Sequence, residues 1–169
     1  MDEHIQNIVD SINNDSKYLD DIVEGLVISC CQDLDDYIAY VKGLLDDVDT
    51  PIADAELDDI VLTIPTLLYF TGNLQETLGI REDIARMEET NKYNQVLVNA
   101  EGTVQARQAY AKLQVQNESL ATLVYQRACR KIKLRCDYAS EILQSAKKIL
   151  TKRISELELS KNSVNRNQA

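Results

Sequence analysis

The chain has 169 residues, a formal net charge of −10 at pH 7 and 44% hydrophobic residues. This length suits one domain, or one domain with an arm, and the hydrophobic fraction is sufficient for a core. Aromatic residues make up only 5% of the sequence and Trp is absent, which favours a helical bundle built from Leu, Ile, Val and Ala. No stretch approaches eighteen consecutive apolar residues, so we expect no membrane-spanning segment.

The charges are divided unevenly along the sequence. Residues 1–103 contain five Lys or Arg and twenty-three Asp or Glu, a net charge of −18. Residues 104–153 contain eleven Lys or Arg and three Asp or Glu, a net charge of +8. Such asymmetry between two halves of a chain is a hint of an anionic partner.

The acidic first fifty residues predict two helices. Residues 1–14 carry apolar side chains at helical spacing, and this helix is expected to end at the two asparagines that close the stretch. Asp15 or Ser16 then caps a second helix, which should stop at residues 47–50, before Pro51.

A third helical segment is expected to begin at residues 52–55. Pro65 removes a backbone donor and crowds the preceding turn, so we expect a kink or a new helix there. The run at residues 67–70 is the most apolar part of the chain and is expected to be buried. Gly79 is expected to end the segment.

Residues 80–99 predict a fourth helix, and residues 103–158 predict a long amphipathic helix of roughly 80 Å at ~1.5 Å per residue. Thr103 is placed to cap this helix, and Gly102 supplies the break before it. Because the connection at residues 100–102 is short, the two helices are expected to pack antiparallel.

The predicted fold class is therefore all-α: a helical bundle in which a long C-terminal amphipathic helix forms a hairpin with the preceding helix. The predicted regions are an acidic helical region at residues 1–79, the hairpin at residues 80–158 and a disordered polar tail at residues 159–169.

Catalytic and metal-binding equipment is sparse in this sequence. The one histidine, His4, lies near the terminus, and no nucleotide-binding, zinc-protease or serine-hydrolase motif occurs. The adjacent Cys30 and Cys31 have no second ligand pair, and the acidic residues 46–49 lack the Gly and Glu of a calcium loop. We expect no enzyme activity, no metal, and four reduced thiols in an intracellular protein.

The long helix has one wide apolar sector, which runs from Ala121 to Leu150 on a projection of ~100° per residue. Arg135 and Arg153, five turns apart, project into this sector. Two interpretations are open for them. Either their aliphatic stems cover the core with the charged heads at its edge, or they form ion pairs across a bundle or subunit interface.

The basic face of the same helix also has two interpretations. It is either a solvated surface that pairs in part with the acidic helices, or a surface that contacts phosphates. Tyr110, Tyr125 and Tyr138 lie near basic residues and could stack on bases, although a core position suits Tyr125 better. An amphipathic helix of this length exposes its apolar stripe unless something covers it, so we also expect self-association.

Three stretches between residues 58 and 158 resemble a family of small helical bacteriophage proteins, the UvsY-like recombination mediators. They read LGIREDIARMEE, AEGTVQARQAYAKL and YQRACRKIKLRCDYASEILQSAKKILTKR. The third stretch carries most of the resemblance, with its aromatic-Arg-Ala start, Ile-Lys centre and Ser-Ala-Lys-Lys-Ile-Leu close. The acidic first fifty residues lie outside it.

The resemblance implies a non-catalytic homo-oligomer without a cofactor, in the cytoplasm of a bacterial host cell. Proteins of this kind bind single-stranded DNA and assist the loading of a RecA-type recombinase in the presence of single-strand-binding protein. Because the net charge is −10, DNA binding requires that opposite charges be separated in space. The candidate nucleic-acid contacts are the basic residues of the third stretch: Arg127, Arg130, Lys131, Lys133, Arg135, Lys147, Lys148, Lys152 and Arg153.

Two other classes of protein fit the sequence. One is a structural or assembly protein, such as a phage scaffold, a virion component or a helical adaptor, that acts through helix packing. The other is an acidic inhibitor whose front half imitates nucleic acid. Salt dependence separates DNA binding from apolar helix packing, since only phosphate binding weakens steeply as salt rises.

Overall fold

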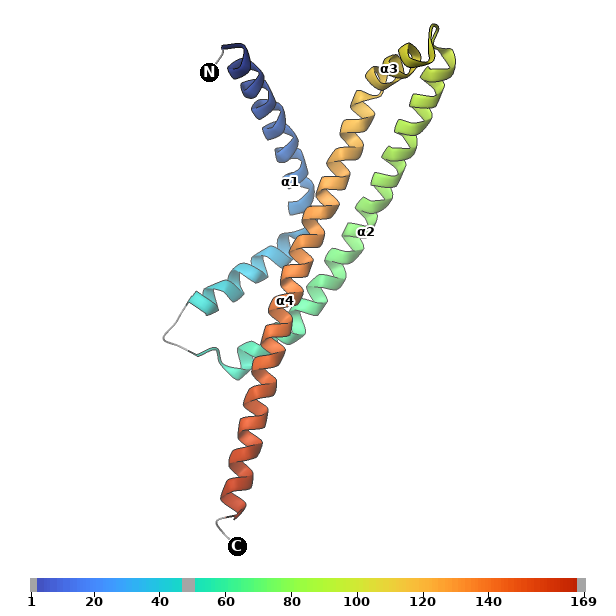
Figure 1. The fold of residues 1–169 in the computed structure, drawn as a ribbon. Coiled ribbons are helices and arrows are strands. Elements are labelled where there is room, and N and C mark those ends of the chain that lie inside the picture. The colour runs from blue at the N-terminus through green and yellow to red at the C-terminus, as the bar shows by residue number, and fades with distance from the viewer. Residues whose placement is uncertain (1–2, 47–50, 167–169) are drawn as a thin grey trace. The chain divides into compact units, whose positions relative to one another are not determined.

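The computed structural model describes residues 3–46 and 51–166, with side chains for residues 16–46 and 51–160. Over these ranges the chain forms four α-helices and no strand, so the all-α prediction is confirmed (Figure 1). None of the helices, over the same ranges, is long and apolar enough to cross a membrane. The helices are α1 (Glu3–Asp46), α2 (Asp54–Asn99), α3 (Val104–Gln114) and α4 (Gln116–Arg166).

The first two helices are longer than the sequence predicted. α1 continues through residues 13–16, where we expected one helix to end and another to begin. α2 runs through Pro65 and Gly79, so neither residue starts or ends a helix as predicted. Pro65 is exposed, where water can satisfy the carbonyl that it leaves unpaired, and a single helical Gly costs only about 1 kcal/mol.

The predicted helix at residues 103–158 is instead divided into α3 and α4. They are separated by Val115, whose φ of −106° and ψ of 13° leave the helical region. No Gly or Pro stands there, but the Val115 side chain is only 4% exposed, which ties the break to packing. α4 then continues to Arg166, past Glu158, where we expected the long helix to end and a disordered tail to begin.

Packing groups the chain into two compact units. Unit 1 combines Met1–Cys30 with Asn73–Lys133, and unit 2 combines Cys31–Gly72 with Leu134–Ala169. Parts of α1, α2 and α4 therefore occur in each unit, whereas the predicted regions follow charge and composition along the sequence.

Unit 1 contains the predicted hairpin between α2 and the α3–α4 segment (Figure 1). Lys92 on α2 pairs with Glu118 on α4 at 2.6 Å, and the Gln75 side chain, farther from the turn, donates to the Cys129 carbonyl at 3.4 Å. Lys92 thus contacts residue 118, whereas Gln75, earlier on α2, contacts residue 129, later on α4. Contacts in this order show that the two helical segments run antiparallel. The predicted hairpin is confirmed.

The turn of this hairpin is fixed at both ends. Gly102 has a φ of +107°, a conformation that residues with a Cβ rarely adopt. Thr103 caps α3 as predicted, because its hydroxyl accepts from the Ala106 amide at 3.3 Å. The Arg107 guanidinium donates to the Leu97 carbonyl at 3.0 Å, which satisfies an acceptor in the last turn of α2.

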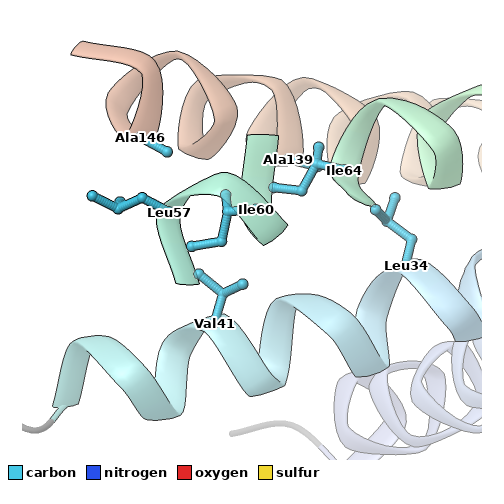
Figure 2. Packing of buried hydrophobic residues seen from close by; sticks show 7 residues of the cluster. All are labelled: Leu34, Val41, Leu57, Ile60, Ile64, Ala139 and Ala146. Carbon is cyan, nitrogen blue, oxygen red and sulfur yellow. The ribbon is translucent and has the colours of Figure 1, made fainter. Parts of the chain in front are cut away.

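Unit 2 is built around a cluster of buried aliphatic side chains from three helices. The alanines of α4 are small and allow the helices to approach closely (Figure 2). The cluster consists of Leu34 and Val41 from α1, Leu57, Ile60 and Ile64 from α2, and Ala139 and Ala146 from α4. Within the apolar run at residues 67–70, Leu67 and Leu68 pack against this cluster, but Tyr69 and Phe70 are exposed and stack edge-on at 5.5 Å. The predicted burial is therefore wrong for these two aromatic residues.

Candidate nucleic-acid interface

The candidate nucleic-acid contacts on α4 divide into two classes. Three of them are held by carboxylates of the same chain, and the other six are exposed to solvent. The held residues are Lys131, Arg135 and Arg153. The exposed residues are Arg127, Arg130 and Lys133, here called the first cation group, and Lys147, Lys148 and Lys152, here called the second cation group.

Lys131 lies in unit 1 between two carboxylates of α1. Its ammonium donates to Asp20 at 2.8 Å and to Glu24 at 3.0 Å. The hydrogen bond to Asp20, followed by the one to Glu24, raises the pKa of Lys131. The Lys131 ammonium is therefore already bound by two carboxylates of α1, which a phosphate would have to displace.

Arg135 and Arg153 are both ion-paired within unit 2. Arg135 pairs with Asp35 on α1, and Arg153 pairs with Asp54 at the start of α2. The Arg153 guanidinium also donates to the carbonyl of Ile52 at 2.8 Å. Of the two interpretations of these arginines, the ion pairs across the bundle are confirmed.

The first cation group belongs to unit 1 and occupies one row of the α4 surface. Arg127, Arg130 and Lys133 follow one another at a spacing of three residues, which makes them neighbours on a helix. None of the three forms an ion pair with any residue whose side chain the structure describes. Like charges at this spacing cost about 0.2–0.5 kcal/mol per pair, a cost that an anionic partner would offset.

The second cation group belongs to unit 2. Lys148 and Lys152 are neighbours at a spacing of four, and Lys147 lies about 100° around the helix from Lys148. Lys152 has an exposed contact with Glu156 at 3.8 Å, a distance and setting at which an ion pair contributes little. Lys147 and Lys148 have no such contact within residues 16–46 and 51–160.

An open groove in unit 1 lies beside the first cation group. Its volume is about 560 Å³, and it lies between α1 and α4. Leu19, Val23 and Val124 give it apolar walls. Its charged lining residues are Asp20 and Lys131, which pair with each other, and Arg127, which has no ion pair with a described residue. Arg127 lines this groove and also belongs to the first cation group. A flat apolar ring bound in the groove would therefore lie close to a cation that is free to bind phosphate.

The three tyrosines that the sequence placed near the basic residues differ in exposure. Tyr110 on α3 and Tyr138 on α4 are exposed, and Tyr125 is half-buried. Tyr138 also lines a groove of about 430 Å³ in unit 2, whose lining includes the carboxylate of Glu141. Tyr110 and Tyr138 are therefore accessible for stacking, and Tyr125 is less so.

A third groove brings together residues that the sequence analysis did not single out. Arg86, Glu89 and Tyr93 on α2 and Lys112 on α3 line a groove of about 600 Å³ in unit 1. Arg86 is paired with Glu82 at 2.6 Å, whereas Lys112 is exposed and has no ion pair with a described residue. Only the register of the hairpin brings these residues together, and the sequence contains no motif for it.

Two findings bear on other chemistry. Among the side chains that the structure describes, no group of three or more His, Cys, Asp or Glu residues is arranged to hold a metal. All four cysteines are thiols rather than disulfides, and burial raises the pKa of both Cys129 and Cys136. A raised pKa lowers the thiolate fraction, which makes these two thiols poor nucleophiles near neutral pH.

Comparisons with protein-family models, with curated proteins and with solved structures each find no match to this chain.

Proposed function

We propose that this chain is a non-catalytic accessory protein of phage recombination or replication that binds single-stranded DNA. The observation that carries this proposal is the exposure of both cation groups on a chain in which acidic residues outnumber basic ones. Five of these six cations have no ion pair within the described residues, although twenty-eight carboxylates are present in the chain. Cations that stay unpaired amid such an excess of acid are available to phosphate.

The grooves and the tyrosines support a single strand as the type of nucleic acid. Single-stranded binders combine a cationic track for phosphates with aromatic or apolar surfaces for unstacked bases. The groove beside Arg127 offers apolar walls next to an exposed cation, and Tyr110 and Tyr138 are exposed rings. Duplex DNA keeps its bases stacked, so these features favour a single strand.

The acidic helix α1 gives this binding a built-in competitor. Asp20, Glu24 and Asp35 hold two of the candidate cations on α4, Lys131 and Arg135. We infer that these carboxylates limit the number of phosphates that the chain binds. The loading of a RecA-type recombinase, which the resemblance implies, would then use weak and reversible DNA contacts.

Fluorescence anisotropy with a labelled single-stranded oligonucleotide at two salt concentrations tests DNA binding. We expect binding at low salt, and an affinity that falls steeply as salt rises. Lys147→Glu with Lys148→Glu should lower the affinity and flatten the salt slope by about 0.7 for each phosphate that the variant no longer neutralises. Arg127→Glu with Arg130→Glu should do the same for the first cation group.

The matched control is Lys17→Glu with Lys42→Glu, which makes the same charge change at two exposed positions of α1. Affinity that falls equally in the control and in the α4 variants would reflect net charge alone and would contradict a local site. Absence of binding by the parent at low salt would also overturn the proposal.

The recombinase step has its own measurement. Adding the protein should raise the DNA-dependent ATPase activity of a RecA-type recombinase on single strands precoated with single-strand-binding protein. The α4 variants that lose DNA affinity should lose this stimulation. If the parent binds DNA but gives no stimulation, the chain binds DNA without loading a recombinase.

A second candidate function is a structural or assembly role through helix packing. Specific support comes from the many large apolar side chains that remain exposed, among them Leu62, Ile80 and Met87 on α2. Salt separates the two functions, because apolar association is not weakened by the salt that dissociates a phosphate complex.

A further inference from the structure

An uncharged stripe runs along the part of α2 that belongs to unit 1. On a projection of ~100° per residue, eight exposed positions fall within a sector of about 80°, and none of them carries a charge. The stripe is roughly 38 Å long at ~1.5 Å per residue. We call it the α2 stripe; its members are Asn73, Thr77, Ile80, Ile84, Met87, Asn91, Gln95 and Val98.

The apolar members of the α2 stripe are among the most exposed large side chains of unit 1. Ile80 is 55% exposed, Ile84 is 51% exposed and Met87 is 64% exposed. Scattered apolar residues on a surface are common, but a series at spacings of four and three is typical of a helix–helix seam. The opposite face of α2, which carries Leu78 and Ala85, is already buried in unit 1.

Charged residues border the α2 stripe on both sides. Arg81 and Glu88 lie along one edge, seven residues apart, and Glu76 and Asp83 lie along the other. All four are exposed, and none forms an ion pair with any residue among 16–46 and 51–160. The first edge therefore carries one free charge of each sign, at a separation of two helical turns.

We propose that the α2 stripe is the seam of a two-fold antiparallel dimer of this chain. In an antiparallel helix pair, each edge meets the same edge of the other copy. When Ile84 packs against the partner's Met87, Arg81 faces the partner's Glu88. The two-fold axis repeats this ion pair, so the edge is complementary to its own copy.

The other edge agrees with the same register. Asp83 then faces the partner's Thr90, so no carboxylate meets another carboxylate. A parallel pair would place Asp83 against the partner's Glu88, which is repulsive, while Glu76 met the partner's Arg81. Charge complementarity thus favours a second copy in antiparallel orientation, and this inference does not depend on DNA binding.

Sedimentation equilibrium of the full chain without DNA tests the seam. The parent should dimerise, and Ile84→Asp should raise the dimer Kd by roughly 100-fold, since it places two carboxylates in the centre of the seam. The control is Leu113→Asp, which adds the same charge at an exposed apolar position of α3 outside the stripe. A monomeric parent, or equal losses in both variants, overturns the proposal.

Charge variants at the edge test the orientation, and they keep the proposal open to refutation if Ile84→Asp does not fold. Glu88→Arg should raise the dimer Kd by about tenfold, because two ion pairs become two repulsions. Adding Arg81→Glu to it should restore the parent Kd, since the two charges are then exchanged. In a parallel dimer Glu88→Arg would meet Asp83 and tighten association, an outcome that overturns the antiparallel seam.

Discussion

The Lys131 ammonium on α4 lies 2.8 Å from the Asp20 carboxylate on α1. Glu24, one turn further along α1, reaches the same ammonium at 3.0 Å. A phosphate that approaches Lys131 must displace both carboxylates, so the acidic helix competes directly with DNA at this position. The opposite charges of the two halves of the chain thus meet at specific contacts rather than only as a general attraction.

Asp20→Asn with Glu24→Gln is expected to strengthen binding to single-stranded DNA. The two amides keep the shape of the side chains but lose the charges that hold Lys131. With Lys131 released, the salt slope should steepen by about 0.7, which corresponds to one more phosphate neutralised on a single strand. Anisotropy titrations at several salt concentrations measure both the affinity and the slope.

Asp21→Asn with Asp33→Asn supplies the matched control, because both aspartates are exposed on α1 and neither contacts Lys131. It removes the same net charge, so it should change the affinity less and leave the slope unchanged. Equal effects of the two double variants would show that general repulsion, rather than the contact at Lys131, limits binding. Deleting residues 1–50 is a poorer experiment, since it removes Leu34 and Val41 from the core of unit 2.

Arg153→Gln is expected to destabilise the protein while changing DNA affinity little. Arg153 pairs with Asp54 and donates to the Ile52 carbonyl, so its charge is already used inside unit 2. Loss of these hydrogen bonds should cost about 1 kcal/mol of unfolding free energy. Urea unfolding measures the cost, and a large fall in DNA affinity at full helicity would show instead that Arg153 contacts DNA.

Ile64→Ala is expected to lower the free energy of unfolding by about 2–5 kcal/mol. Ile64 is fully buried in the cluster of unit 2, and truncation leaves a cavity as well as losing apolar burial (Figure 2). Leu62→Ala, two residues earlier on the same helix, truncates a side chain that is 71% exposed and should stay within about 0.5 kcal/mol. Similar losses for both variants would contradict the packing of unit 2.

The buried face of α4 could be predicted from the sequence, because the helical spacing of its apolar residues is enough to define it. Ala128, Ile132, Ala139 and Ala146 recur at helical spacing, and all four are buried as the apolar sector predicts. The ends of the helices were less accessible. Local signals such as Pro65 predicted breaks that do not occur, because a long helix packed along its length tolerates an exposed interruption.

The carboxylate partners of the α4 cations could not be predicted from the sequence, for a different reason. Arg135 and Asp35 are 100 residues apart, and only the packing of α4 on α1 brings them together. The apolar sector of the helix therefore allowed an ion pair at Arg135 as one interpretation, but nothing in the sequence identified Asp35 as its partner. The apolar spacing of residues 103–158 also predicts an apolar stripe on the long helix. An exposed, regularly spaced stripe lies on α2 as well, where Asn, Thr and Gln make the apolar period less visible in the sequence.

The Tyr37 hydroxyl on α1 donates to the Asp59 carboxylate on α2 at 2.7 Å, within unit 2. Burial, followed by this hydrogen bond, raises the pKa of Tyr37 from 10.0 to about 12. A group whose pKa is higher in the folded than in the unfolded state stabilises the fold at any pH low enough to keep the group protonated in both states. This contribution is therefore fully present below about pH 10 and is lost as the pH rises toward 12.

Tyr37→Phe is accordingly expected to lower the stability of the protein by a constant amount below about pH 10, and by progressively less between about pH 10 and 12. Urea unfolding at a series of pH values measures this difference, and titration of phenolate absorbance should show one high-pKa tyrosine missing from the variant. Tyr40→Phe is the control, because the Tyr40 hydroxyl has no hydrogen bond to a described residue, and it should leave the high-pKa tyrosine in place. If the parent and Tyr37→Phe differ equally at pH 9 and pH 12, the hydrogen bond to Asp59 does not link folding to this titration.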